Sequence, residues 1–264
     1  MYDDTRDDYL QPSIKSQPRI SCLMPTYNRL RRRPDGSIDA VIVEEAIESF
    51  VRQQYVNREL FIINDTPGQT LRLPDDPRYS DITLINSPTR FETLGHKYRH
   101  AIDRMSGDYF TPWDDDDISL PGRLNSCRSH LRGADVMTVH GFYFMDDDTN
   151  KLTFDGQNGY MNDVYSLPLA RRVGYPLQSA DADRVAREQF SVAADIKHAL
   201  RPNSSWHFYI YRWRATQRLH LSSLSYADET GYATIGRQPI VEVDYELQPH
   251  WQQDYVELVK RHFP

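Results

Sequence analysis

The chain has 264 residues, of which 39% are hydrophobic and 26% are charged, and its formal net charge is -7 at pH 7. These values are typical of a globular protein with one large α/β domain or two small ones, and the negative charge argues against a general nucleic-acid-binding surface. Cys22 and Cys127 are the only cysteines and lie far apart, which argues against a disulfide framework and a zinc knuckle. With neither a leader nor an apolar segment of transmembrane length, the sequence predicts a cytoplasmic protein.

The first part of the chain predicts a strand, a helix and a second strand. Residues 1–18 are polar and predict a flexible lead-in. Each predicted strand ends in a polar loop, as in a βαβ unit, and open α/β sheets bind ligands at the edge where such loops lie. The predicted elements are a strand at 19–24 stopped by Pro25, a loop at 25–29, a helix at 38–54, a strand at 60–63 and a turn at 64–68.

The following residues continue the alternation of strands and helices. A fourth strand carries a run of four aspartates, Asp114 to Asp117, to the edge that the loops 25–29 and 64–68 share. Asp146 to Asp148 form a second acidic group, in a turn whose Asp and Asn residues favour local hydrogen bonds. The predicted elements are strands at 82–85, 108–113, 136–139 and 206–213, helices at 94–105, 120–131 and 250–261, and a hairpin at 142–154.

The aspartate run has two interpretations. Adjacent carboxylates raise one another's cost of ionisation, so a tight acidic loop needs solvent, hydrogen-bond donors or a cation. Mg²⁺ and Mn²⁺ prefer oxygen ligands and take one or two carboxylates, completing their shell with phosphate and water. The alternative is a solvated turn in which Asp117 or Ser119 caps a helix that begins near Pro121. Convergence of the three loops favours the metal site.

Three motifs together carry a resemblance to a known family. They are Pro-Thr-Tyr-Asn-Arg at 25–29, Ile-Ile-Asn-Asp-Thr at 62–66, and Gly-Asp-Tyr at 107–109 running into Trp-Asp-Asp-Asp-Asp-Ile at 113–118. In this order and spacing they resemble the family 2 glycosyltransferases, which have the α/β GT-A fold with a mixed sheet flanked by helices. The resemblance implies a nucleotide-sugar-binding half at 19–132, an acceptor and catalytic half at 133–224, and a C-terminal helical extension at 225–264.

The resemblance also implies donor-binding and metal-binding residues. Thr26 and Tyr27 would lie against the nucleobase and Asp65 would bond it, with Asn64 where many relatives have another aspartate. Asp114 would face the ribose and also belong to the metal site, Asp116 would be the principal metal ligand, and Asp115 and Asp117 would be lesser contributors. The registry within the run stays open by one position. The further donor-binding candidates are Pro25, Arg29, Gly95, Lys97, Arg99 and Asp115.

For the second half, the segment from Ser179 to Arg187 resembles the family's acidic segment that supplies the catalytic base. It makes Asp181 the better base candidate and Asp183 the second, although the two could also be carboxylates in a first helical turn. His220, with His207 as the alternate, would complete the metal site. His96 and His100 have zinc-pair spacing but no third ligand, so a helix face is the better interpretation of that pair.

Taken together, the sequence predicts a metal-dependent, inverting glycosyltransferase that uses Mn²⁺ or Mg²⁺ and a nucleotide-sugar donor, with a UDP-sugar as first choice. A metal-dependent nucleotidyltransferase and an inactive nucleotide-sugar-binding relative are the alternatives. The acceptor stays open among a polysaccharide, a lipid-linked glycan, a protein and a modified DNA base, and the oligomeric state stays open too.

Overall fold

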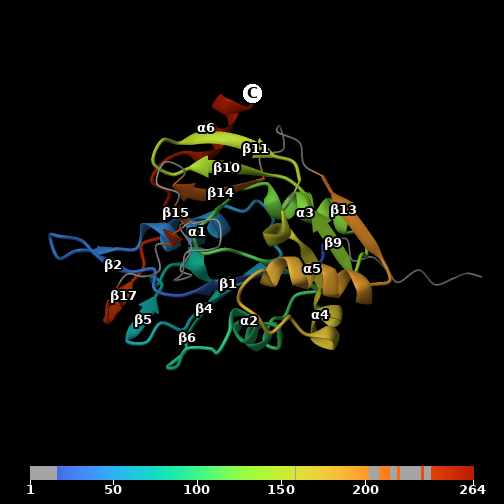
Figure 1. The fold of residues 1–264 in the computed structure, drawn as a ribbon, viewed down its shortest axis with the longest axis horizontal. Coiled ribbons are helices and arrows are strands. Elements are labelled where there is room, and N and C mark those ends of the chain that lie inside the picture. Colours follow the sequence, from blue (N-terminus) through green and yellow to red (C-terminus); the bar gives the residue numbers. More distant parts are fainter. Residues whose placement is uncertain (1–16, 158, 202–207, 215–218, 221–232, 235–238) are drawn as a thin grey trace, which may run out of the picture.

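The computed structural model describes residues 17–157, 159–201, 208–214, 219–220, 233–234 and 239–264, with only the backbone at 219–220 and 233–234 (Figure 1). Its centre is a mixed sheet of seven strands in the order β13-β9-β12-β7-β1-β4-β6. Four neighbouring strands, β7, β1, β4 and β6, are parallel, whereas β12 is antiparallel to both of its neighbours. The bounds are β1 (Ile20–Thr26), β4 (Arg58–Asn64), β6 (Ile82–Asn86), β7 (Tyr109–Pro112), β9 (Val136–Val139), β12 (Val164–Ser166) and β13 (Lys197–Leu200).

Helices cover both faces of this sheet because its strands are apolar on both sides. Along β1, Cys22 and Met24 belong to one core cluster and Leu23 to another, since successive side chains point to opposite faces. The first cluster includes α1 (Val41–Val51) and α3 (Arg123–Leu131), and the second includes α2 (Leu94–Ile102), α4 (Leu167–Val173) and α5 (Ala182–Ala193).

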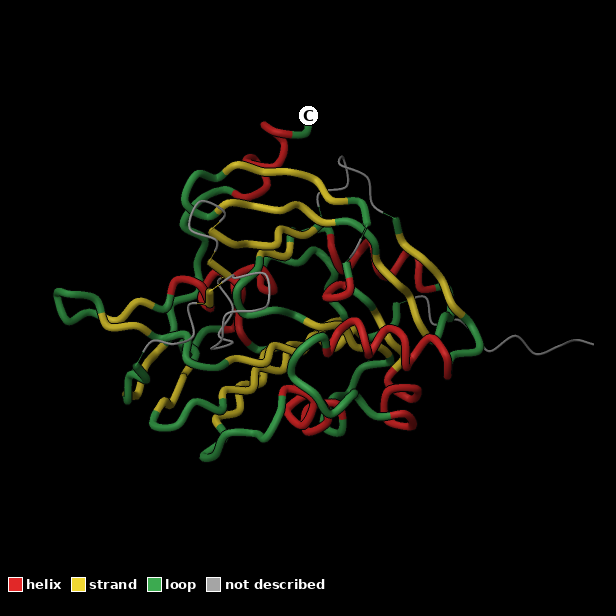
Figure 2. The backbone as a smooth tube through the Cα atoms, viewed as in Figure 1, coloured by secondary structure: helices red, strands yellow, loops and turns green. Residues whose placement is uncertain are grey.

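A second sheet, with the path β11-β10-β14-β15-β16, lies above the first in the view of Figures 1 and 2. The C-terminal helix α6 (Tyr255–His262) packs on it through a third core cluster that contains Leu258 and Val259. The bounds are β8 (Ile118–Ser119), β10 (Phe142–Asp146), β11 (Lys151–Asp155), β14 (Tyr209–Arg214), β15 (Leu219–His220) and β16 (Ala233–Thr234), with β8 paired to β14. Two small ladders pair β2 (Arg31–Arg32) with β3 (Ile38–Asp39) and β5 (Gln69–Arg72) with β17 (Val243–Glu246).

The structure confirms the α/β class and the predicted strand-helix alternation, with two corrections at the sheet edge. Strand β1 continues through Pro25 to Thr26 instead of stopping at Pro25, because its ladder with β4 continues there while its pairing with β7 ends at Leu23. Pro25 therefore loses no ladder bond to β7. The helix predicted at 120–131 begins at Arg123, after Gly122, with no side-chain cap. The alternative in which Asp117 or Ser119 caps this helix is therefore wrong.

Other elements lie outside the sequence-based prediction. The short strands β5, β12, β13 and β17 and the helix α4 were not predicted, and β17 shows that the C-terminal extension contains a strand as well as a helix. The predicted lead-in lies largely outside the described residues, as does His207. Within the described ranges, no helix combines the length and the apolar character needed to cross a bilayer.

Buried Asp163 ties helix α5 to the central sheet. Its carboxylate accepts from Arg187 Nε at 2.6 Å and Nη2 at 2.5 Å, from the Val139 amide at 2.8 Å and from the Tyr165 hydroxyl at 3.0 Å. The side chain of Asp163 is fully buried. This ion pair therefore fixes the helix that has Asp181 at its N-cap and Asp183 in its first turn.

We expect Asp163→Ala to lower the free energy of unfolding by about 3 to 5 kcal/mol, because it leaves the largely buried Arg187 without its carboxylate. Urea denaturation monitored by circular dichroism measures this change. The matched control is Glu188→Ala, which removes the exposed partner of Arg184 and should cost no more than about 0.5 kcal/mol. If both variants lost the same free energy of unfolding, the Asp163–Arg187 ion pair would not be what fixes helix α5.

Candidate active site

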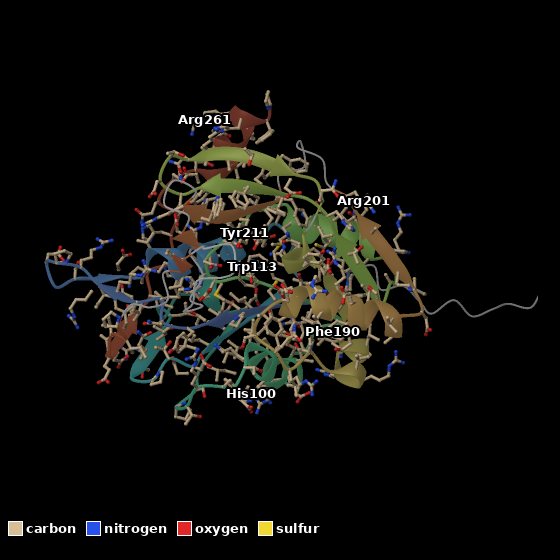
Figure 3. The ribbon with its side chains drawn as sticks, viewed as in Figure 1. His100, Trp113, Phe190, Arg201, Tyr211 and Arg261 are labelled. Carbon is tan, nitrogen blue, oxygen red and sulfur yellow. The ribbon has the colours of Figure 1, made fainter. Side chains whose placement is uncertain are left out.

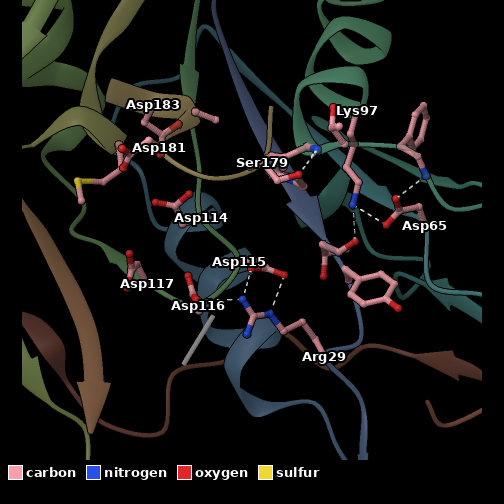
Figure 4. A pocket seen from close by; sticks show the side chains of 18 of the residues that line it. Arg29, Asp65, Lys97, Asp114, Asp115, Asp116, Asp117, Ser179, Asp181 and Asp183 are labelled. Carbon is pink, nitrogen blue, oxygen red and sulfur yellow. Dashed lines mark hydrogen bonds and ion pairs between the residues drawn. The ribbon is translucent and has the colours of Figure 1, made fainter. Parts of the chain in front are cut away.

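A pocket of about 420 Å³ lies at the carboxyl ends of β1, β4 and β7 (Figure 4). It brings together the three loops that the sequence placed at this edge, and parallel sheets bind ligands at this position. The predicted site residues that line it are Pro25, Thr26, Tyr27, Arg29, Asp65, Lys97, Asp114, Asp115, Asp116, Asp181 and Asp183. The other lining residues are Arg90, Phe91, Glu92, Thr93, Leu94, Asp117, Tyr160, Met161, Ser179, Ala182, Arg184 and Tyr211.

Three predicted donor-binding residues, Asn64, Gly95 and Arg99, are not among the residues that line the pocket. The Asn64 amide donates to Asn86 Oδ1 and to the Gln69 carbonyl, each at 3.0 Å, and so connects β4 to its neighbours. A Cβ at Gly95 would lie 1.9 Å from the carbonyl oxygen of Pro176, so the glycine permits close approach of the two segments. Arg99 Nε donates to the Tyr175 carbonyl at 2.6 Å. All three hold the wall in place.

Arg29 is the main cation of the acidic turn. Its Nε donates to Asp115 Oδ2 at 2.8 Å, and its Nη2 donates to Asp115 Oδ1 at 2.5 Å and to Asp116 Oδ2 at 2.9 Å (Figure 4). Its side chain is only 3% exposed. Because a buried arginine needs a carboxylate partner, the Pro-Thr-Tyr-Asn-Arg loop and the acidic turn are held together at this contact.

A second contact joins the ends of the turn. The Tyr209 hydroxyl lies 2.9 Å from Asp114 Oδ2 and 2.5 Å from Asp117 Oδ2, and the Arg212 amide donates to Asp117 Oδ1 at 2.7 Å. Asp115 and Asp117 are buried, while Asp114 and Asp116 are partly exposed to the pocket. The turn thus alternates between carboxylates that hold the protein together and carboxylates open to a ligand.

The carboxylates of the turn are incompletely neutralised. Burial, and then the charges of Asp183, Asp117 and Asp116, raise the pKa of Asp114 well above its usual range. Burial and Asp116 likewise raise the pKa of Asp117, and burial raises that of Asp116 although Arg29 opposes the shift. Negative charge at this site is therefore costly, and either a proton or a cation can relieve the cost.

A divalent cation fits this donor set. Within the described residues, no group of three or more His, Cys, Asp and Glu side chains forms a ready metal shell. The partly exposed oxygens of Asp114 and Asp116 are hard ligands, and Mg²⁺ typically takes only one or two carboxylates together with phosphate and water. The backbone of His220 lies in β15, and its side chain is outside the described residues, as is all of His207.

At the other end of the pocket, Lys97 and Asp65 form a buried pair. Lys97 Nζ donates to Asp65 Oδ1 at 2.5 Å and to the Thr26 carbonyl at 3.0 Å, and the Phe91 amide donates to Asp65 Oδ2 at 3.0 Å. Burial lowers the pKa of Lys97, while Asp65 opposes the shift. The carboxylate of Asp65 is therefore held rigidly beside the loop that carries Tyr27.

The loop after β6 supplies lining residues that no sequence motif indicated. The Arg90 guanidinium lies over the Tyr27 ring, 4.0 Å from its centroid. Glu92 and Thr93 also line the pocket from this segment. The signal available in the sequence was topological, because this loop follows a third strand whose carboxyl end lies at the same edge.

Asp181 and Asp183 lie at the start of α5, on the side of the pocket near Asp114 (Figure 4). Asp181 has a left-handed backbone with φ of 55°, and its side chain is 70% exposed and paired with Arg184 at 3.2 Å. Backbone strain at a non-glycine residue is often found at functional sites. Asp183 is partly buried and accepts from the Tyr175 hydroxyl at 2.7 Å, and burial raises its pKa.

Comparison with known proteins identifies the family. The profile described as Glycosyl transferase family 2 matches residues 21–181, which is more than half of the 264 residues. The chain belongs to glycosyltransferase family 2. The match covers the three motifs and ends at Asp181, so the part of this family 2 chain from Ala182 onward lies beyond it.

Curated relatives are similar over only part of their length. EpsE of Bacillus subtilis (strain 168) is 35% identical over 116 residues, which cover 42% of this chain and 37% of that protein. WcaA of Escherichia coli (strain K12) is 30% identical over 140 residues, which cover 51% of this chain and 44% of that protein. The chain thus matches less than half the length of these relatives.

Solved structures show the same fold. TarS of S. aureus, residues 1–349 in complex with UDP-GlcNAc, has a TM-score of 0.55 and 14% identity over 74% of this chain and 59% of that one. The mannosyltransferase PcManGT from Pyrobaculum calidifontis, in complex with GDP-Man and Mn²⁺, has a TM-score of 0.50 and 14% identity over 82% of this chain and 59% of that one. The predicted GT-A architecture is confirmed.

The pair Lys97–Asp65 makes a testable prediction about the pocket. Lys97→Met should lower the free energy of unfolding by about 3 to 5 kcal/mol, because it leaves Asp65 buried without its cation. Removing both charges, in Asp65→Asn with Lys97→Met, should recover much of this loss in urea denaturation.

The exposed Lys260, paired with Glu257, provides the matched control. Lys260→Met should leave the free energy of unfolding nearly unchanged, because solvent screens this pair. The pairing would have no energetic role if the double variant were as unstable as the sum of the two single variants.

Proposed function

We propose that the chain is a metal-dependent, inverting glycosyltransferase that transfers a sugar from a nucleotide-sugar donor, with UDP as the nucleotide, to an acceptor hydroxyl. One observation carries the proposal. A single pocket combines the loops at the ends of β1, β4 and β7, a partly open and under-neutralised acidic turn, and two further carboxylates at the start of α5. Family membership supports the reaction class.

The nucleoside would occupy the end of the pocket near Tyr27 and Asp65. The Tyr27 ring offers a stacking surface, and Asp65 retains acceptor capacity because a carboxylate has about four lone-pair sites, of which Lys97 and the Phe91 amide occupy two. A single N–H donor, as uracil presents, suits this remaining capacity. Lys97 would act by orienting Asp65, since its ammonium group already bonds that carboxylate.

Asp114 and Asp116 would hold Mn²⁺ or Mg²⁺, which supplies Lewis-acid stabilisation of the negative charge on a leaving diphosphate. Asp115 is committed to Arg29, and Asp117 to Tyr209 and Arg212, so these two would keep the turn in shape. Asp114 also lies near Asp183, where a ribose hydroxyl or a sugar hydroxyl could donate to either carboxylate.

Asp181 would be the general base. An exposed carboxylate that lines the pocket is accessible to an acceptor arriving from solvent, and its ion pair with Arg184 holds the side chain at the start of α5. Asp183 is the second candidate because it is less exposed than Asp181 and one of its oxygens already accepts from the Tyr175 hydroxyl at 2.7 Å. The proton of the attacking hydroxyl would pass to Asp181 as the oxygen attacks the anomeric carbon from the face opposite the leaving diphosphate.

The donor is tested by thermal unfolding with UDP, UDP-GlcNAc, GDP or GDP-mannose, each with and without Mn²⁺. At about one hundred times its Kd, a uridine ligand with Mn²⁺ should raise the Tm by on the order of 5 °C. Asp116→Ala should remove the metal-dependent part of this shift. If GDP were the only nucleotide to raise the Tm, and did so equally with and without Mn²⁺, both the proposed uridine specificity and the proposed metal dependence would be contradicted.

The base is tested by comparing Asp181→Asn with Asp183→Asn. A positioned general base contributes about 10²- to 10⁴-fold to the rate, so Asp181→Asn should lower the rate of sugar transfer by a factor in this range. The affinity for UDP with Mn²⁺ should stay unchanged. Asp183→Asn should lower the rate of sugar transfer by a smaller factor. If Asp183→Asn loses more of the transfer rate than Asp181→Asn, Asp183 is the base. Release of pyrophosphate from a nucleoside triphosphate would instead show that the chain is a nucleotidyltransferase.

A further inference from the structure

The segment 251–255, which leads into helix α6, lies beyond the family match, yet a continuous buried network connects it to the acidic turn. The network runs from Tyr255 through Glu45 of α1 to Arg212 of β14 and ends at Asp116 and Asp117. Its side chains are almost fully buried: those of Arg212 and Glu45 are each 2% exposed, and Tyr255 is 2% exposed.

Arg212 holds the turn through two contacts that differ from those of Arg29. Its Nε donates to the Asp116 carbonyl at 2.7 Å, and its backbone amide donates to Asp117 Oδ1 at 2.7 Å. One residue thus fixes both a peptide group and a side chain within the turn. Because the carbonyl held by Arg212 belongs to Asp116, this contact determines the orientation of the peptide from which the partly exposed Asp116 carboxylate projects.

Glu45 holds Arg212 in this position. Arg212 Nη1 donates to Glu45 Oε2 at 2.5 Å, and the distance from the same nitrogen to Asp147 Oδ1 is 3.9 Å. A buried arginine with one close carboxylate is oriented by that carboxylate, since any other position would leave both charges desolvated and unpaired. The place of the guanidinium therefore depends on the place of Glu45.

The C-terminal segment in turn orients Glu45. The Tyr255 hydroxyl donates to Glu45 Oε1 at 2.8 Å, and the backbone amide of Gln252 donates to the same oxygen at 2.9 Å. The Trp251 indole Nε1 donates to the Glu45 carbonyl at 3.2 Å. The two oxygens of this carboxylate therefore have different partners, since Oε2 binds Arg212 while Oε1 accepts from the C-terminal segment.

We infer that Tyr255, Glu45 and Arg212 are positioning residues that set the geometry of the acidic turn for the divalent cation, so that the C-terminal segment takes part in cation binding. The inference rests on the proposed function of the turn. It assigns to residues 251–255 a role beyond covering α1, because the network ends on the peptide between Asp116, the proposed cation ligand, and Asp117.

The test compares Tyr255→Phe with Tyr245→Phe. Both remove one hydroxyl that donates to a glutamate of α1, but Tyr245 donates to Glu44 Oε1, at 3.5 Å, and Glu44 is not a member of the network. Mn²⁺ affinity is measured by electron paramagnetic resonance at a saturating concentration of UDP, and thermal unfolding is measured without metal.

Tyr255→Phe should weaken Mn²⁺ binding about fivefold, the effect of one net hydrogen bond, while Tyr245→Phe should leave it unchanged. Arg212→Lys, which keeps the charge but loses the planar fork, should weaken it further. The inference would be overturned if Tyr255→Phe left the Mn²⁺ affinity unchanged, or if Tyr245→Phe weakened it equally. The network would then contribute to stability only. Failure of the parent protein to bind Mn²⁺ with UDP would instead overturn the proposed function, and the inference with it.

Discussion

The crowding of four adjacent carboxylates into one turn, two of them buried and two partly buried, is the constraint on which the rest of the structure depends. Four negative charges in one turn repel one another, and burial removes the water that would screen them. Arginines balance these charges from two directions, Arg29 from the loop after β1 and Arg212 from β14, and the Tyr209 hydroxyl lies between the two ends of the turn. Because the pKa values of Asp114, Asp116 and Asp117 are still raised, these contacts do not fully compensate the negative charge of the turn.

Sheet topology determines which charges meet at the turn. The parallel pairing of β4, β1 and β7 brings the carboxyl ends of three strands to one edge, so residues near positions 29, 65 and 115 become neighbours. The second sheet adds β14 through its pairing with β8, which directly follows the turn. Trp113 and Tyr211 accordingly lie near the centre of the molecule, between the sheets, whereas Arg201 and Arg261 lie at its periphery (Figure 3). The acidic turn is therefore a junction between the sheets.

The sequence predicted what depends on local pattern and missed what depends on distant partners. Strands β1, β4, β6 and β7 were predicted because each is a short apolar run that ends in a polar loop, and this pattern also located the edge at which the pocket lies. By contrast, the contacts of Gly95 and Arg99 with the segment around Tyr175 and Pro176, 76 to 81 residues further along the chain, were not predicted. No local pattern encodes such a contact. The same holds for β5 and β17, whose pairing joins Gln69 to Val243.

The acidic motif and the groups that balance its charge come from different parts of the chain. The residues that the family profile matches supply the pocket loops after β1, β4 and β7 and the four carboxylates of the turn. Tyr209, Arg212 and the donors to Glu45 all come from later positions. The four carboxylates of the motif repel one another wherever the motif occurs. The second sheet supplies the Arg212 guanidinium and the Tyr209 hydroxyl that offset part of this repulsion, and the C-terminal segment orients Glu45, which holds Arg212. A motif of fixed sequence can thus have a cation affinity that its surroundings determine, because the free energy of charging each aspartate depends on these distant donors.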